Sequence, residues 1–440
     1  MRIFHLALLL QLAAYQPGEL RRRLFGEPGC RITLAPSLVN EFVIASESSM
    51  AKGLPSLLKT VVESGPPKIN FEKDFDINQG ALPMPYVKPS NYRYVQNALE
   101  AQRFAQSQEP APFLKELTSK DCDVDPLDRN AQLAFFKKNS KAIEKLKLKF
   151  GCVYFKGWSV FTDSKGLEAA AEAMGMALCS DPALFLGARY QLENEGKVFE
   201  ASNRQEDSKT HIGMHTEATP GFRPSTGIFA CFKAAESGGE FLVCDGNRVM
   251  RDLDTETLER LEKKEMMGVL AEFPEWISLP PGPLKNNPVL RRMSEEAFAL
   301  IFDLTKPTDE YQLWSLANRQ DKHFTVSTKT SKPLYHHPVT NMPIWLHNFH
   351  AGHSGIFLTN NPHIKKATRS SFSTTNFDWV YGDGTTVTDE DVASIQTVHD
   401  DNTIALKMKP GDALMVDNWR TLHGRKPFKG ERKHAVVWGV

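Results

Sequence analysis

Short apolar runs of strand length, separated by turn signals, recur along the second half of this chain. The predicted strands are Thr226–Phe232, Glu240–Cys244, His323–Ser327, Ile344–Phe349, Thr403–Met408, Ala413–Val416 and Ala435–Val440. Glycine-rich and proline-containing turns lie between them, including Gly238-Gly239, Gly382-Asp383-Gly384 and Pro410-Gly411-Asp412. Many short strands with this punctuation predict a β-sandwich or a barrel.

Helical segments are interspersed with the predicted strands. They are Ser140–Phe150, Gly166–Leu178, Asp254–Lys264, Ser294–Leu304 and Thr388–Val398. No GxGxxG or GxxxxGK[ST] motif occurs, which argues against a nucleotide-dependent fold. We therefore predict an α+β, mainly β fold: a double-stranded β-helix (jelly roll) core with flanking helices.

The N-terminal part of the chain differs in character from the rest. Residues 1–20 contain the apolar run Phe4–Tyr15, which fits either a cleaved signal or presequence or a short buried helix. Residues 21–130 are predicted to form an irregular extension, because prolines interrupt every long periodic segment. Two short helices are expected within it, near Leu54–Glu63 and Tyr94–Gln106. Residues 131–440 then form the jelly-roll domain.

Composition excludes several classes of function. The chain has 53 Lys and Arg and 53 Asp and Glu, so a broad basic surface for nucleic acid is not expected. No apolar window reaches the ~18 residues that a membrane span needs. The six cysteines show no CxxC spacing and there is no N-x-S/T sequon, which favours a cytoplasmic or organellar location. The N-terminal run leaves the location open.

A metal-binding motif is present at Met214-His215-Thr216-Glu217. If this segment is a strand, His215 and Glu217 point to the same face. With one more histidine from elsewhere, they would make the 2-His-1-carboxylate set typical of non-haem Fe(II) oxygenases. A lone His-x-Glu tripeptide often arises by chance, so a second motif is needed.

That second motif lies near the C-terminus, from Gly411 to Arg432. A predicted strand leads to His423 at its end, and Phe428, Gly430 and Arg432 then lead into a final apolar strand. An arginine that follows a metal-ligating histidine can bind a carboxylate bidentately. The co-substrate would therefore be a dicarboxylate with one end on the metal and the other on the arginine.

Over residues 139–440 the sequence resembles the clavaminate synthase-like branch of the TauD/TfdA Fe(II)/2-oxoglutarate dioxygenases. The resemblance is carried by HTE at 215–217, by IFACF and AESGGE at 228–240, by YGDG at 381–384 and by GDALMVDNWRTLHGRKPFKGER at 411–432. It implies that His215, Glu217 and His423 ligate iron. It also implies that Arg432 binds the distal carboxylate of 2-oxoglutarate.

Two positions depart from the family pattern. Phe241 stands where a threonine often donates a hydroxyl to the co-substrate, and Val436 replaces a common second arginine. The first departure makes the co-substrate more dependent on Arg432, with help from Lys433. The second removes one reason to expect a sulfonate substrate.

The resemblance implies an oxygenase of a small amino-acid-like molecule, such as those of secondary metabolism. The enzyme would oxidise a C–H bond by hydroxylation, desaturation or oxidative cyclisation, consume O2 and release succinate and CO2. One alternative is a non-catalytic jelly-roll binding protein that retains the metal site. Another is a zinc hydrolase, against which the dicarboxylate anchor argues.

Other candidate residues have a functional and a structural interpretation. The segment His347–His353 offers three histidines for a rival metal site, but a loop facing solvent or the pocket mouth is the favoured interpretation, and Gly352 argues against a helix. The position of this segment in the family pattern implies that His350 and His353 lie near substrate. His211 is expected to support the site without ligating metal. Asp417 either orients Arg425 or His423, or simply forms a turn.

Overall fold

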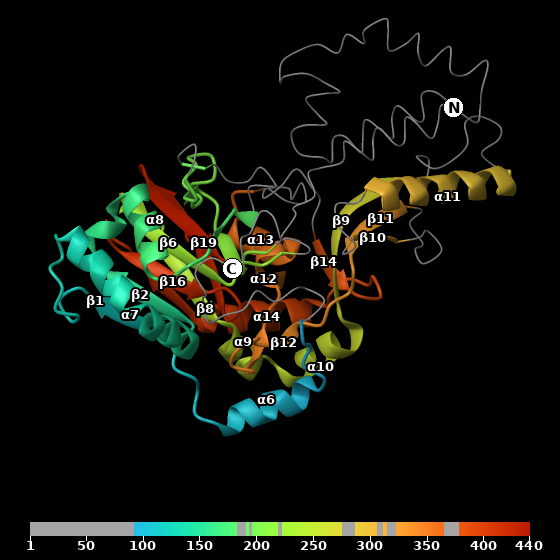
Figure 1. Cartoon of the computed structure of the whole chain (residues 1–440). Helices are drawn as coiled ribbons and strands as arrows, with labels where there is room; N and C mark the ends of the chain where they lie inside the picture. The colour runs from blue at the N-terminus through green and yellow to red at the C-terminus, as the bar shows by residue number, and fades with distance from the viewer. Residues whose placement is uncertain are drawn as a thin grey trace, which may run out of the picture. The chain divides into compact units, whose positions relative to one another are not determined.

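The computed structural model describes residues 92–182, 191–192, 196–218, 222–274, 287–305, 311–314, 323–364 and 378–440 (Figure 1). The chain divides into two compact units, one of residues 1–70 with 272–327 and one of residues 71–271 with 328–440. The predicted apolar N-terminal run and the predicted helix Leu54–Glu63 lie outside the described residues. The metal-binding motifs both belong to the second unit.

A large sheet in the second unit has the order β1-β2-β16-β6-β19-β3, and β4 also pairs with β19. Its strands are β1 Lys115–Thr118, β2 Cys152–Lys156, β3 Leu178–Cys179, β4 Phe199–Glu200, β6 Thr226–Lys233, β16 Ala413–Asp417 and β19 Lys433–Gly439. Only the β1–β2 pair is parallel; the others are antiparallel. Strand β1 precedes residue 131, so this sheet begins within the predicted extension. The domain boundary at 131 itself stays a prediction.

A smaller, fully antiparallel sheet has the order β15-β8-β17-β5. Its strands are β5 Ile212–His215, β8 Phe241–Asp245, β15 Thr403–Leu406 and β17 Thr421–Arg425. Shorter pairs are β7 Ser237–Gly238 with β18 Phe428–Lys429, β12 Leu334–His336 with β13 Pro343–Trp345, and β9 Met266–Pro274 with β14 Asp378–Tyr381. The first unit contributes α11 Pro288–Thr305, β10 Tyr311–Trp314 and most of β11 His323–Thr328.

The two sheets face each other through alternate side chains. Phe229 of β6 lies 4.7 Å from Phe241 of β8 and 4.9 Å from His423 of β17, measured between ring centroids. Its neighbours Ile228 and Ala230 instead belong to the core cluster on the opposite face of β6. This two-sheet arrangement confirms the predicted α+β, mainly β jelly-roll fold, although it is not a closed barrel.

Helices cover the outer face of the large sheet. They are α7 Arg129–Phe150 and α8 Ser164–Ala173, and they enclose a cluster around Phe136, Phe155 and Trp158. Helix α7 begins well before the predicted Ser140, because the side chain of Asp128 caps it by accepting a hydrogen bond from the N–H of Ala131.

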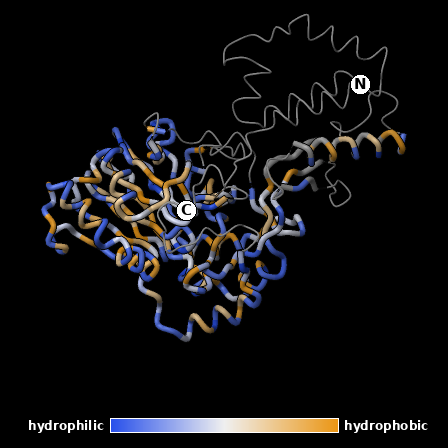
Figure 2. The backbone as a smooth tube through the Cα atoms, in the orientation of Figure 1, coloured by the Kyte–Doolittle hydropathy of each residue, from blue (hydrophilic) through white to orange (hydrophobic). Residues whose placement is uncertain are grey.

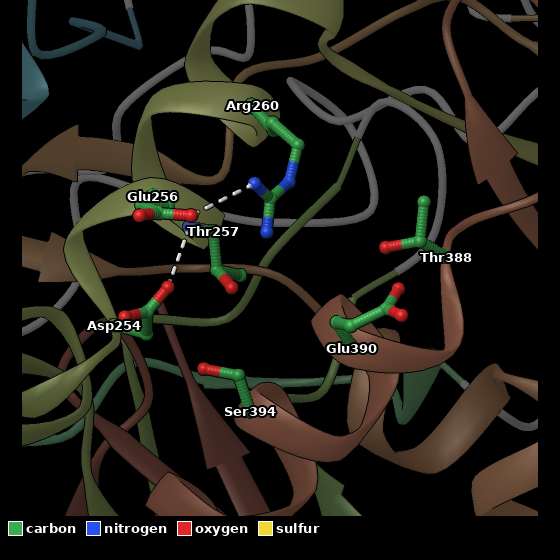
Figure 3. Close-up of a pocket in the computed structure, with 7 residues that line it drawn as sticks. All are labelled: Asp254, Glu256, Thr257, Arg260, Thr388, Glu390 and Ser394. Carbon is green, nitrogen blue, oxygen red and sulfur yellow. Dashed lines mark hydrogen bonds and ion pairs between the residues drawn. The ribbon is translucent and has the colours of Figure 1, made fainter.

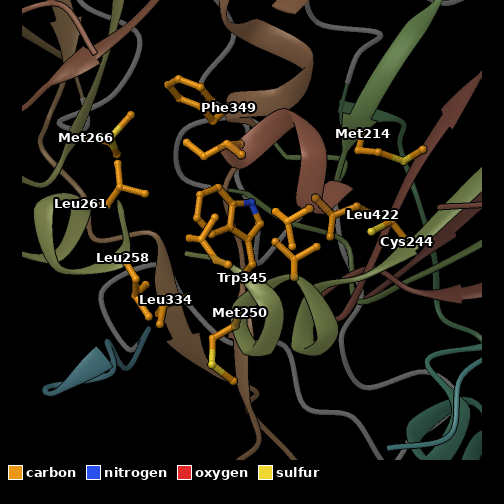
Figure 4. Packing of buried hydrophobic residues seen from close by; sticks show 14 of the residues in the cluster. Met214, Cys244, Met250, Leu258, Leu261, Met266, Leu334, Trp345, Phe349 and Leu422 are labelled. Carbon is orange, nitrogen blue, oxygen red and sulfur yellow. The ribbon is translucent and has the colours of Figure 1, made fainter. Parts of the chain in front are cut away.

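A second core lies on the outer face of the smaller sheet. Met214, Cys244 and Leu422 from its strands pack with Trp345, which lies at the centre of the cluster in Figure 4. Surrounding helices are α6 Ala98–Ser107, α9 Gly246–Asp252, α10 Thr255–Lys264 and α14 Asp389–Asp401. Helix α6 confirms the helix expected near Tyr94–Gln106, and it shows both polar and apolar residues in Figure 2.

The predicted strand Ile344–Phe349 is wrong in its second half. Strand β13 stops at Trp345, and the short helices α12 Phe349–Gly352 and α13 Ser354–Asn360 follow. Among the helices of the described residues, we find none with the length and apolar character needed to cross a membrane.

Candidate metal centre

Two histidines from neighbouring strands face each other between the sheets. His215 is the last residue of β5 and His423 is the central residue of β17, where the antiparallel register pairs them directly. Their ring centroids are 4.4 Å apart. The sequence prediction that the distant histidine joins the His-x-Glu motif therefore holds geometrically, although His423 lies within its strand and not at its end.

Glu217 reaches the same point from a loop. The prediction that it shares a strand with His215 is wrong, because β5 ends at His215 and residues 216–218 have no regular structure. Its Oε2 atom nevertheless lies 4.0 Å from Nε2 of His423. The potential ligand atoms of all three residues lie within 4.8 Å of one another. In the described parts of the chain, this is the one group of three or more His, Cys, Asp or Glu residues that could hold a metal ion.

The donor set suits a divalent transition metal. Nδ1 of His215 is 2.8 Å from the carbonyl oxygen of Gly213, to which it donates, so Nε2 keeps the lone pair that a metal requires. His423 is 3% exposed and Glu217 is 9% exposed, so both are largely out of water, whereas His215 is half-buried. Two imidazoles and one carboxylate match the facial set of non-haem Fe(II) sites.

Aromatic side chains lie beside His423. Phe241 stacks on His423 with an interplanar angle of 12°, and Phe229 packs between Phe241 and Trp438. All of these side chains are buried. Phe241 therefore presents an apolar surface beside His423, at the position where the resemblance implied a threonine hydroxyl.

Arg432 is buried without a carboxylate partner in the described structure. Its Nη1 donates to the carbonyl oxygen of Ala201 at 2.8 Å and to Oδ1 of Asn203 at 3.0 Å, whereas its buried Nε has no hydrogen-bond partner there. Burial, and the charge of Arg425, lower the pKa of this guanidinium to about 9. By contrast, Lys433 is 63% exposed and pairs with Glu431, so its ammonium group lies at the surface.

Arg425 is a second buried guanidinium that the sequence interpretation did not assign to the site. Its Nη2 donates to the carbonyl oxygen of Asp207 at 2.9 Å, its Nε has no hydrogen-bond partner among the described residues, and burial lowers its pKa to about 10. Burial lowers the pKa of His434 well below its ordinary value, and the nearby charges of Arg432 and Arg425 lower it further. Two guanidinium groups therefore share one buried region, which favours an anionic ligand. The His-Gly-Arg sequence at 423–425 is the signal that could have indicated Arg425.

The suggestion that Asp417 orients Arg425 or His423 is wrong. Its Oδ2 accepts a hydrogen bond from Nε2 of His337 at 2.9 Å, and its Oδ1 accepts from the N–H of Trp419 at 3.0 Å. Asp417 thus closes the turn between β16 and β17 and holds a buried histidine.

The histidines of segment 347–353 do not face solvent. His347, His350 and His353 are 5%, 1% and 7% exposed, and part of the segment is helical despite Gly352. Nδ1 of His350 accepts a hydrogen bond from the N–H of Met214 at 3.0 Å, so this ring supports β5. His353 stacks on Phe349.

A surface hollow of about 420 Å³ lies between α10 and α14 (Figure 3). It is lined by Asp254, Glu256, Thr257, Arg260, Thr388, Glu390 and Ser394. Asp254 caps α10 by accepting from the N–H of Thr257, and Arg260 pairs with Asp391 and Glu256. Those polar groups are engaged in local structure, and none of the metal-motif residues lines the hollow.

The chain is similar to several known proteins. The family model described as taurine catabolism dioxygenase TauD, TfdA family, matches residues 115–438. The dapdiamide synthesis protein DdaC of Enterobacter agglomerans is 24% identical over 305 residues, which cover 67% of this chain and 84% of that protein. The mitochondrial trimethyllysine dioxygenase of Gallus gallus is 54% identical over 33 residues, 8% of each chain. A solved asparagine oxygenase, in complex with Fe(II), 2S,3S-3-hydroxyasparagine and succinate, aligns with TM-score 0.41 and 13% identity over 74% of this chain and 93% of that one.

Proposed function

Because the chain belongs to the TauD/TfdA family of Fe(II)- and 2-oxoglutarate-dependent dioxygenases, we propose that it oxidises a C–H bond of a small amino-acid-like substrate. In the proposed reaction O2 and 2-oxoglutarate are consumed, and succinate and CO2 are released. For a hydroxylation, one oxygen atom of O2 enters the substrate and the other enters succinate.

The observation that carries the proposal is the convergence of His215, Glu217 and His423, whose ligand atoms lie within 4.8 Å of one another. We assign these three side chains to Fe(II), with the open coordination positions left to co-substrate and O2. When bound, the iron and 2-oxoglutarate supply the oxidising chemistry. The protein supplies a fixed ligand geometry.

The buried arginines would bind the co-substrate. We assign Arg432 to the distal carboxylate of 2-oxoglutarate, since its Nε has no partner in the described structure and the residue is only 3% exposed. Arg425 adds a second positive charge in the same region. A bound carboxylate would compensate for the cost of burying these two charges.

The aromatic side chains of Phe229 and Phe241 would have a different role from the arginines. Phe229 and Phe241 pack against His423 and are buried, so they would exclude water from one side of the metal. A drier site strengthens the electrostatic interactions that orient the co-substrate.

The substrate class is supported by the relatives. A trimethyllysine dioxygenase acts, by its name, on an amino-acid derivative, and DdaC is named for the synthesis of dapdiamide. Hydroxylation, desaturation and oxidative cyclisation are all compatible with this class, and the similarity to DdaC supports a role in secondary metabolism.

The test is co-substrate turnover with pooled substrates. Purified protein with Fe(II), 2-oxoglutarate and air should release succinate well above its background rate when one pool of amino acids or their derivatives is added. Glu217→Gln, which keeps the side-chain size but removes the anionic ligand, is the matched control and should abolish that increase. If Fe(II) and 2-oxoglutarate bind but no pool stimulates succinate release, the amino-acid-like substrate is wrong. If Fe(II) binds but 2-oxoglutarate does not, the non-catalytic binding protein that retains the metal site replaces the proposal. If neither binds, the metal-centre assignment is wrong.

A further inference from the structure

The backbone that carries Glu217 needs partners that the sheet does not provide. Strand β5 is the edge strand of its sheet, and its pairing with β17 stops at His215. Thr216 and Glu217 follow immediately and are 1% and 9% exposed. Buried backbone N–H and C=O groups must be hydrogen-bonded, so something other than a strand has to bind them.

Two asparagine side chains take the place of that strand. Oδ1 of Asn348 accepts from the N–H of Thr216 at 2.9 Å, and its Nδ2 donates to the carbonyl oxygen of the same residue at 2.9 Å. Oδ1 of Asn418 accepts from the N–H of Glu217 at 2.9 Å, and its Nδ2 donates to the carbonyl oxygen of Glu217 at 2.8 Å. Each amide therefore binds both backbone groups of one residue, as a paired strand would.

The asparagines are themselves anchored by the fold. Asn348 lies between β13 and α12, and Asn418 lies in the turn between β16 and β17. Asn418 is fully buried, and its Nδ2 also donates to the carbonyl oxygen of Pro224 at 2.8 Å. The loop that bears Glu217 is thus fixed to two elements that are distant from it in sequence.

We propose that Asn348 and Asn418 are positioning residues that hold the 216–217 backbone and so set the direction of the Glu217 carboxylate toward the two histidines. This inference rests on the proposed function, because it assumes that Glu217 ligates the metal. Metal–oxygen bonds of about 2.0–2.2 Å tolerate little displacement of the ligand. Loss of either pair of hydrogen bonds should therefore weaken metal binding.

The chemistry requires an amide at both positions. An aspartate has nearly the same shape but no donor, so Asn418→Asp would place a carboxylate oxygen against the carbonyl oxygens of Glu217 and Pro224. Partners that orient metal ligands typically change metal affinity by about 10- to 100-fold when they are mutated. We expect that increase in the Fe(II) dissociation constant for Asn418→Asp.

The chain offers a matched control in Asn361. Its Oδ1 accepts from the N–H of His211 at 2.6 Å, and its Nδ2 donates to the carbonyl oxygen of His211 at 3.2 Å. Asn361 is 1% exposed, so the chemistry and burial match those of Asn418, but the residue that it holds precedes β5 and is not a proposed ligand. Asn361→Asp should lower thermal stability, as Asn418→Asp does, and leave the Fe(II) dissociation constant within about threefold of wild type.

The experiment measures metal binding by the full chain without turnover. Fe(II) is titrated anaerobically, and Co(II) is used as a probe whose visible absorption reports its coordination, at a temperature at which circular dichroism shows every variant folded. Wild type should bind both metals, Asn418→Asp should bind more weakly with an altered Co(II) spectrum, and Asn361→Asp should resemble wild type. If Asn418→Asp does not fold, Asn348→Asp, at a half-buried position, takes its place with the same expected result.

The outcomes separate the two proposals. Failure of the wild-type protein to bind Fe(II) or Co(II) would remove the metal centre itself. Normal binding by wild type, with equal affinities and spectra for the Asn418 and Asn361 variants, would show that Asn418 only stabilises the fold and would overturn this inference.

Discussion

Replacement of Arg432 by glutamine tests whether the buried guanidinium anchors the co-substrate. Nη1 of Arg432 is held by Ala201 and Asn203, and its Nε has no hydrogen-bond partner among the described residues. The side chain is therefore oriented before any ligand binds, with a donor left for an anion. Glutamine can still donate one hydrogen bond but carries no charge and no fork of donors.

The size of the effect follows from two charge-assisted hydrogen bonds to a carboxylate. Each contributes about 1.5–3 kcal/mol, so their loss costs at least about 3 kcal/mol. Since about 1.4 kcal/mol corresponds to a tenfold change in affinity, the dissociation constant of 2-oxoglutarate should rise by about 100-fold or more. Fe(II) binding should stay within about threefold, because Arg432 is not one of the three proposed ligands.

Isothermal titration of 2-oxoglutarate into the anaerobic Fe(II) protein measures this directly. Lys433→Gln is the matched control, because it removes a neighbouring positive charge that is 63% exposed and pairs with Glu431. The control should bind 2-oxoglutarate like wild type. An Arg432→Gln protein that binds Fe(II) and 2-oxoglutarate with unchanged affinity would refute the assignment and leave Arg425 as the candidate anchor.

Three further predictions concern stability and ligand binding. Asp417→Ala should destabilise the fold by about 3 kcal/mol, because it removes the buried hydrogen-bond acceptor of His337. Burial raises the pKa of Asp417, but His337 lowers it by more, so the folded-state pKa lies below the ordinary value. The stabilisation should therefore be present above about pH 4 and be lost as the pH falls through the folded-state pKa. Urea unfolding across that range should show a weaker loss of stability at acid pH for the variant than for wild type. Gly213→Ala should cost about 1–3 kcal/mol, because a Cβ there would lie 2.8 Å from Cα of Ala351, and an unchanged melting temperature would contradict the close packing of α12 on β5. Addition of 2-oxoglutarate to the Fe(II) protein at about 100 times its dissociation constant should stabilise the fold by about 2.7 kcal/mol, which a thermal shift assay would detect.

The sequence was most informative for long strands that are continuously apolar. The predicted strand Thr226–Phe232 is observed as Thr226–Lys233, because its apolar residues on both faces leave little ambiguity. The family resemblance implied that His215 and His423 bind one metal, but their direct pairing across β5 and β17 was not predicted. Helix α7 was predicted too short because the capping role of Asp128 was not used.

The loop around Glu217 could not be predicted from local pattern. The alternation His215-Thr216-Glu217 fits a strand, but the partners of this backbone are Asn348 and Asn418, which lie 132 and 201 residues away. Contacts at such separation depend on tertiary packing, which no short motif encodes. The same reason explains why the partner of Asp417 was missed: His337 lies 80 residues away.

The most direct test of the account is whether three side chains hold one iron with 2-oxoglutarate beside it. Anaerobic addition of Fe(II) and 2-oxoglutarate to the wild-type protein should produce a visible charge-transfer absorption band, and His215→Ala or His423→Ala should abolish both the band and iron retention. A wild-type protein with no band, or alanine variants that retain iron and the band unchanged, would contradict the assignment of this metal centre.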